Sequence, residues 1–124
     1  MTIQQKTTKL NTYFDKQITA CSLRGQRLQN DNRGDEATFE KIKANVYDIF
    51  RTILSVAVDI GKGDPAAVQR FFLQKAEQIP ASWVAAYDKA KQHDDVIKMQ
   101  IEQTKLDTIS EIKAYFTQIM EEDQ

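Results

Sequence analysis

The sequence predicts an all-α protein: an antiparallel up-down bundle of four helical legs, with the third leg broken or kinked at Pro80. Three observations lead to this fold class. The 124 residues include only four Gly and two Pro, which disfavours a turn-rich all-β fold. The few helix-breaking stretches fall at regular intervals, in residues 30–35, 61–65 and 93–95. Between these stretches, apolar residues recur with helical spacing.

The breaker stretches divide the chain into legs at about residues 2–29, 35–61, 65–93 and 95–121. Each leg could span roughly 40 Å as a helix, at about 1.5 Å per residue. Short connections make consecutive helices antiparallel neighbours. A chain of this length supports one hydrophobic core, so we expect a single helical-bundle domain over residues 1–124.

The first leg carries one apolar side, which includes Leu10, Phe14, Ile18 and Cys21. Gly25 falls on the same side. A glycine inside a helix costs about 1 kcal/mol relative to alanine, so we expect a neighbouring helix to approach closely at this point. We interpret Cys21 as a small core residue rather than a reactive thiol, because no histidine or second cysteine accompanies it.

The second leg has the clearest pattern, a stripe with alternating spacings of three and four residues. These are the a and d positions of a heptad repeat: Phe39, Ile42, Val46, Ile49, Ile53, Val56 and Ile60. A second stripe beside it holds Tyr47, Phe50, Leu54 and Ala57. If the heptad stripe faces inward, Tyr47 and Leu54 lie at its flank and Val58 lies opposite. Tyr47, Leu54 and Val58 therefore form a candidate interaction surface, unless the third leg folds over Val58 and completes the monomer.

The third leg has apolar residues on both sides of Pro80, from Val68 to Ile79 and from Trp83 to Ala90. Proline lacks an N–H and clashes with the preceding turn, so it should break or kink this leg. Ser82 is available to cap the second half. The fourth leg carries an apolar stripe that ends at Ile119. Because the first leg is mainly basic and the last mainly acidic, their charges would complement each other as bundle neighbours.

The glycine-rich stretch at residues 61–63, Gly-Lys-Gly, looks at first like a phosphate-binding loop. A Walker loop needs Ser or Thr after the lysine and a strand before the loop, and neither is found here. We interpret the stretch as a hinge between two helices. Gly61 is expected to end the second leg in a left-handed conformation, Asp64 to cap the next helix and Pro65 to occupy its first turn.

No constellation of residues for catalysis or metal binding emerges from the sequence. His93 is the only histidine and Cys21 the only cysteine. A zinc site needs several such ligands, a di-metal carboxylate site needs Glu-x-x-His motifs, and nucleophilic catalysis needs a base beside the nucleophile. We therefore expect a protein that is not an enzyme and that holds no cofactor and no metal.

The charge and hydropathy of the sequence indicate which kinds of partner and which cellular compartment to expect. The formal net charge of -1 gives no overall attraction to nucleic acid or to an anionic membrane. The N-terminus has no apolar signal core, and the most apolar run is too short to span a bilayer. A single cysteine fits a reducing compartment. We expect a cytoplasmic protein that binds neither nucleic acid nor membranes.

The C-terminal half resembles small uncharacterised all-helical proteins of Gram-positive bacteria. The resemblance covers under half of the chain and rests on Ile79-Pro80 with Trp83, a turn at His93-Asp94, and Ile101-Glu102 with Lys105-Leu106. These motifs are structural, so the resemblance implies a helical fold and no activity. A looser similarity, in architecture alone, is to bacteriocin immunity proteins.

We expect this small soluble protein to act without catalysis by binding another protein, possibly a copy of itself. One alternative is an immunity-type protein that binds a toxin or the receptor of a toxin. Another is a phosphorelay domain that uses His93, since histidine phosphotransfer domains use one exposed histidine on a four-helix bundle. The carboxylates of Asp94 and Asp95 beside His93 would repel a phosphoryl group, which argues against this second alternative.

Overall fold

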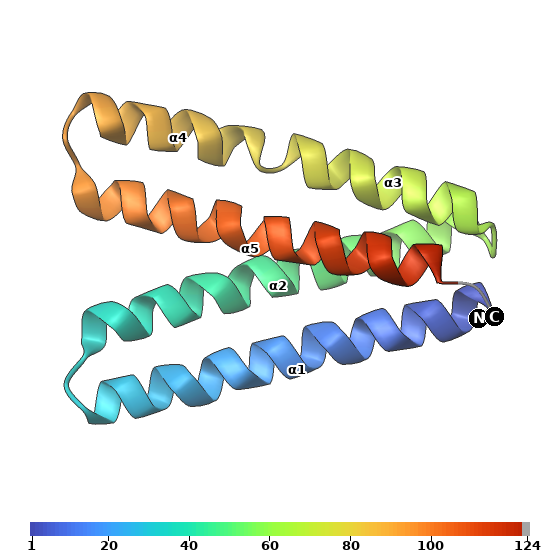
Figure 1. Ribbon diagram of the computed structural model, residues 1–124, viewed down its shortest axis with the longest axis horizontal. Helices are drawn as coiled ribbons and strands as arrows, with labels where there is room; N and C mark the ends of the chain where they lie inside the picture. Colours follow the sequence, from blue (N-terminus) through green and yellow to red (C-terminus); the bar gives the residue numbers. More distant parts are fainter. Residues whose placement is uncertain (123–124) are drawn as a thin grey trace.

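The computed structural model describes residues 1–122, which contain five α-helices and no strand (Figure 1). The helices are α1 (Ile3–Asn30), α2 (Gly34–Gly61), α3 (Pro65–Gln78), α4 (Ala81–Gln92) and α5 (Val96–Glu121). Together, α3 and α4 form one leg, so the chain runs up and down through four antiparallel legs (Figure 1). The predicted fold class is confirmed. No helix within residues 1–122 combines the length and apolarity needed to cross a bilayer.

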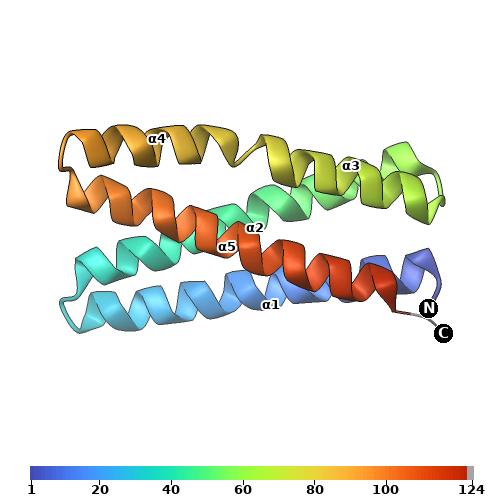
Figure 2. The same cartoon turned by 45° about the horizontal axis from the view of Figure 1, so that its top comes forward.

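The third leg is interrupted at Ile79 and Pro80, as the sequence predicts. Both residues keep right-handed helical backbone angles, so α4 continues in nearly the same direction as α3 (Figure 2). The expected cap from Ser82 is wrong. Pro80 is the N-cap of α4 without a side-chain hydrogen bond, and the Ser82 hydroxyl instead donates to the carbonyl of Ile79 at 3.3 Å.

A column of three phenylalanine rings forms the centre of the core and joins three helices. Phe116 of α5 stacks on Phe72 of α3 with ring centroids 3.9 Å apart. Phe72 in turn meets the edge of Phe50 of α2 at 5.9 Å. Leu10 and Phe14 of α1 belong to the same buried cluster. Because all four legs contribute, the core ties the bundle together near the end that holds the termini (Figure 1).

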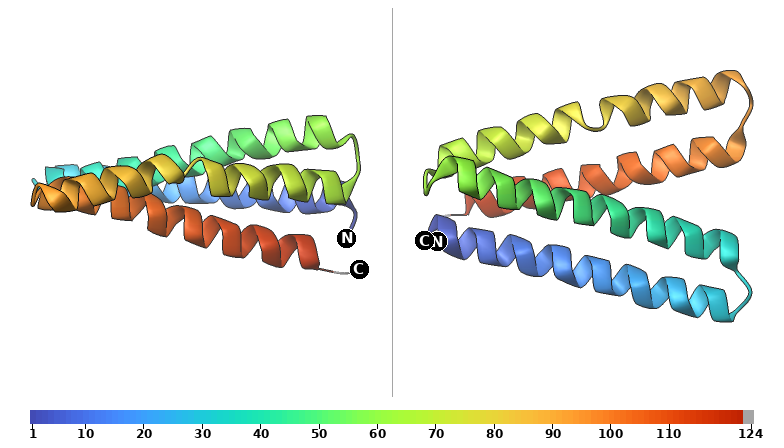
Figure 3. Two further views of the ribbon diagram at one scale, coloured as in Figure 1. Left: turned by 90° about the horizontal axis from the view of Figure 1, so that it is seen from above. Right: turned by 180° about the vertical axis from the view of Figure 1, so that it is seen from behind.

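The two ends of the bundle differ in depth (Figure 3). Near the termini, α1, α2, α3 and α5 surround the core from four sides. At the far end, α4, α5, α2 and α1 lie close to a single layer, in that order (Figures 1 and 3). A layer of helices buries its apolar faces only when another layer packs on it. In agreement, Val96 and Ile97 at the start of α5 are exposed at this far end.

The loop between α2 and α3 is the hinge that the sequence predicts, with one correction. Asp64 caps α3 through its side chain, and Pro65 opens the helix. Gly61, however, stays helical, and Lys62 takes the left-handed conformation at φ 47°. The reason for the glycine is close packing: a Cβ on Gly61 would lie 2.6 Å from Cγ2 of Val68. Gly61 is needed for the approach of α3 to α2 rather than for the turn.

Candidate functional site

The structure overturns the predicted interaction surface on α2. Tyr47 and Leu54 are core residues, with 3% and 0% of their surface exposed. Val58 is partly buried and packs against the same core. The inward face of α2 is the stripe of Tyr47, Phe50, Leu54 and Ala57. Of the heptad stripe, Val46 alone is fully buried in the same core. Since α2 contacts α1, α3 and α5, the arc that it buries is set by these three neighbours.

The apolar surface that α2 does expose belongs to the heptad stripe. Ile49, Val56 and Ile60 are 38%, 38% and 55% exposed, and Ile53 between them is half-buried. We call these four residues the α2 stripe. They lie at i, i+4, i+7 and i+11, so they share one side of the helix. The sequence analysis identified these residues as an apolar stripe but took the stripe to face the core. In the structure, Ile49, Val56 and Ile60 are exposed instead.

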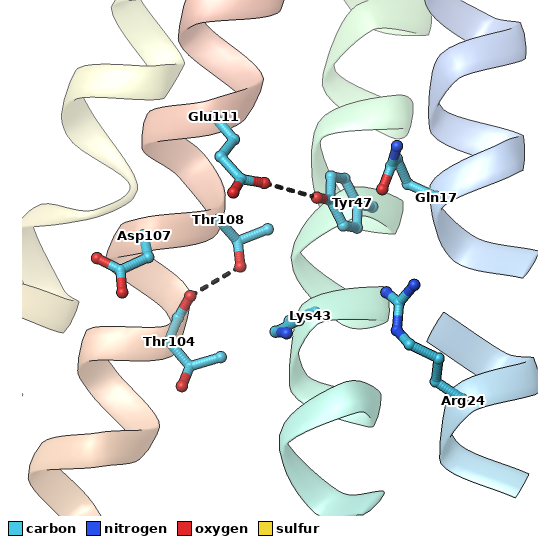
Figure 4. Close-up of a pocket in the computed structure, with 8 residues that line it drawn as sticks. All are labelled: Gln17, Arg24, Lys43, Tyr47, Thr104, Asp107, Thr108 and Glu111. Atoms are coloured by element: carbon cyan, nitrogen blue, oxygen red, sulfur yellow. Dashed lines mark hydrogen bonds between the residues drawn. The ribbon is translucent and has the colours of Figure 1, made fainter. Parts of the chain in front are cut away.

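A polar pocket lies on another side of α2, between α1, α2 and α5 (Figure 4). Its volume is about 460 Å³. Eight side chains line it: Gln17, Arg24, Lys43, Tyr47, Thr104, Asp107, Thr108 and Glu111. Cations come from α1 and α2, whereas α5 supplies the carboxylates. The lining residues come from three separate parts of the chain, which is why no local sequence motif marks the pocket.

Glu40 is a buried carboxylate that holds the two cations of the pocket in place. It accepts a hydrogen bond from Arg24 Nε at 2.6 Å and one from Lys43 Nζ at 3.0 Å. Burial acts to raise the pKa of Glu40, but the hydrogen bonds and charges of Arg24 and Lys43 outweigh it and leave the pKa below its ordinary value of 4.5. Glu40 is therefore ionised at neutral pH and fastens α1 to α2.

Replacing Glu40 with glutamine is expected to destabilise the fold by about 1–2 kcal/mol near neutral pH, because the charged hydrogen bonds are weakened. The folded pKa lies below the unfolded one, so this contribution is fully present above about pH 4.5 and is lost as the pH falls through the folded value. Urea unfolding at neutral pH and at about pH 3 should show the difference between wild type and variant shrinking on acidification.

The matched control is Glu36→Gln, which changes an exposed glutamate near the start of the same helix. Its ion pair within residues 1–122 is with exposed Arg33, and exposed pairs contribute little. The control should therefore change the urea midpoint much less than Glu40→Gln does. A stability loss in Glu40→Gln that stays the same at both pH values would contradict the role assigned to this carboxylate.

Tyr47 lies at the bottom of the pocket, where its hydroxyl donates a hydrogen bond to Glu111 Oε2 at 3.2 Å (Figure 4). Burial raises the pKa of Tyr47 well above its ordinary value, and the nearby Tyr13 and Glu111 add to this effect. The phenol is therefore protonated at physiological pH and acts as a hydrogen-bond donor. The pocket presents polar and charged groups but no activated base or nucleophile.

The residues with reactive side chains lie apart from one another. Cys21 is buried, and burial followed by the charge of Glu40 raises the pKa of its thiol, which is unfavourable for a nucleophile. His93 is exposed and caps the C-terminus of α4, one residue beyond the helix. The histidine of the phosphorelay alternative thus sits in a turn and not within a helix. Among residues 1–122, no three His, Cys, Asp or Glu side chains group into a metal site.

Comparison with known proteins identifies no relative of this chain. No protein-family model matches the chain, and searches of curated proteins and of solved structures find no significant match.

Proposed function

We propose that this protein works without catalysis, as a module that binds another protein through the α2 stripe. The observation that carries the proposal is the exposure of Ile49, Val56 and Ile60 on one side of a single helix. Scattered single apolar residues on a surface need no explanation, but a contiguous row is typical of an interaction site. The stripe is a row of apolar side chains on α2 that the other helices leave exposed.

The free energy available from burying the α2 stripe suits a weak, reversible interface. Fully burying an aliphatic side chain is worth about 1.5–3 kcal/mol, and each of these side chains has roughly half of that still to gain. Three of them contribute a few kcal/mol, whereas a micromolar complex requires about 8 kcal/mol. The contact must then extend beyond the stripe, and the exposed residues Asn45 and Thr52 beside it are available for the polar rim.

The reactive groups of the chain support a role without catalysis. The buried Cys21 thiol has a raised pKa, and the buried Tyr47 phenol stays protonated. His93 stands by itself in the turn between α4 and α5. Catalysis by a nucleophile needs a base within hydrogen-bond reach, and none of these residues has a hydrogen bond to another of them.

Photo-crosslinking in cells that produce the protein naturally tests the proposal. A photoreactive phenylalanine replaces Val56 in the stripe or, as the matched control, Ser55. Ser55 is also exposed but faces another side of α2. We expect a discrete protein adduct from position 56 and none from position 55. The absence of any adduct at position 56, or the same adduct from both positions, would refute the proposal.

A further inference from the structure

We propose that the polar pocket between α1, α2 and α5 binds a small zwitterion, a molecule that carries one carboxylate and one ammonium group about one helical turn apart. The pocket is separate from the α2 stripe, so this inference goes beyond the proposed function and does not rest on it. The pocket volume of about 460 Å³ lies within the range of roughly 300–1,000 Å³ that is usual for small-molecule sites.

Opposite charges line the pocket without neutralising one another. Arg24 and Lys43 reach it from α1 and α2, whereas Asp107 and Glu111 reach it from α5 (Figure 4). Within residues 1–122, the ion pairs of both cations are with Glu40, and neither carboxylate of α5 takes part in an ion pair. Because two cations share one carboxylate, their wall of the pocket keeps a positive charge, and the α5 wall keeps a negative one. A bound zwitterion would satisfy both walls.

The cationic wall keeps hydrogen-bond donors for an anion. Arg24 uses Nε for Glu40, and its Nη2 contacts Sγ of Cys21 at 3.5 Å. Its Nη1 has no hydrogen-bond partner in the part of the chain that the structure describes. Lys43 Nζ donates one hydrogen bond, to Glu40 at 3.0 Å, out of the three that an ammonium group can donate. Glu40 therefore orients both cations and still leaves donors that suit a carboxylate.

The α5 wall and the bottom of the pocket offer acceptors for an ammonium group. The buried Thr108 hydroxyl donates its proton to the carbonyl of Thr104 at 2.7 Å, and the Tyr47 hydroxyl donates its proton to Glu111 Oε2. Each hydroxyl has only one proton, so toward a ligand both oxygens act as acceptors. Glu111 Oε1 accepts no hydrogen bond from residues 1–122. An ammonium group donates three hydrogen bonds, and Glu111, Thr108 and Tyr47 supply three acceptors.

The spacing of the charged groups along the helices selects the length of the ligand. Glu111 lies level with Tyr47, because their side chains are hydrogen-bonded. Lys43 precedes Tyr47 by four residues, which is about 6 Å along α2. In γ-aminobutyrate, three methylene groups separate the ammonium nitrogen from the carboxylate carbon, a span of about 5 Å when extended. This compound therefore matches the spacing of the pocket and is a suitable probe.

Titration of the full chain with γ-aminobutyrate, followed by nuclear magnetic resonance, tests the site. We expect saturable shifts of the backbone amide signals of Lys43, Tyr47, Thr108 and Glu111, with a dissociation constant on the order of 1 mM. Butyrate lacks the ammonium group and butylammonium lacks the carboxylate, so each should bind at least about fivefold more weakly. The proposal is overturned by the absence of saturable shifts at these residues up to about 10 mM, or by butyrate binding as tightly as γ-aminobutyrate.

Two variants test the two walls separately. Glu111→Gln should weaken γ-aminobutyrate binding by about fivefold and leave butyrate binding no weaker, because it removes the charge that faces the ammonium group. Lys43→Gln should weaken the binding of both compounds. The control Lys91→Gln changes an exposed residue of α4 outside the pocket and should alter neither. The spectra also show whether each variant is folded. A folded Glu111→Gln variant that binds γ-aminobutyrate like Lys91→Gln would refute the ammonium site.

Discussion

Replacing Phe116 with alanine is expected to cost about 3–5 kcal/mol of unfolding free energy, the usual range for a fully buried phenylalanine. Phe116 has no exposed surface and stacks on Phe72, which in turn meets Phe50. Truncation removes the apolar contacts of the ring and leaves a cavity at the junction of α3 and α5. Because small domains are stable by only about 5–15 kcal/mol, a loss of this size removes a large share of the stability of the fold.

Urea unfolding followed by circular dichroism measures this loss. Phe116→Leu is a milder companion variant, since a smaller but still apolar side chain leaves less of a void. Val84→Ala is the surface control, because Val84 is 47% exposed. The expected order of destabilisation is Phe116→Ala, then Phe116→Leu, then Val84→Ala. A loss below about 1 kcal/mol for Phe116→Ala would mean that the ring column is not the centre of the core.

Two glycines should respond to alanine with opposite signs. In Gly61→Ala, the new methyl group would lie 2.6 Å from Cγ2 and 3.2 Å from the backbone nitrogen of Val68. Backbone cannot move aside as a flexible side chain can, so we expect a loss of about 1–3 kcal/mol, as for other overpacked sites. In Gly25→Ala, the nearest atom is Cβ of Glu40 at 3.7 Å, an ordinary contact. At this position, the better helix propensity of alanine should stabilise the folded protein by up to about 1 kcal/mol.

Thermal and urea unfolding of both variants check this pair of predictions. Each substitution adds the same methyl group to a helical glycine. The difference between them reports the surroundings of the two sites and their positions, inside α1 for Gly25 and at the last residue of α2 for Gly61. Gly25 does face α2 near Glu40, as the sequence suggests, but the space there is wide enough for a side chain. A stable Gly61→Ala variant would show that α3 can shift away from α2 at no cost.

Much of the architecture is predictable from local signals in the chain. Helix-breaking residues and apolar spacing predict four legs, and Pro80 predicts the break in the third because it cannot continue the preceding turn. Asp64 and Pro65 mark the start of α3 by the same local chemistry. Each of these features depends on the residue itself and on its neighbours in sequence, so the rest of the fold is not needed to predict it.

The sequence by itself thus determined the helices, their order and the absence of a local motif for catalysis. Only the tertiary structure decided which side of α2 faces the core. Helical periodicity relates the residues of one helix to each other but says nothing about its rotation relative to its neighbours. The positions of α1, α3 and α5 set that rotation, so they buried Tyr47 and Leu54 and left Ile49 and Val56 outside. The same neighbours, and no local pattern, brought Arg24, Tyr47 and Glu111 to one pocket.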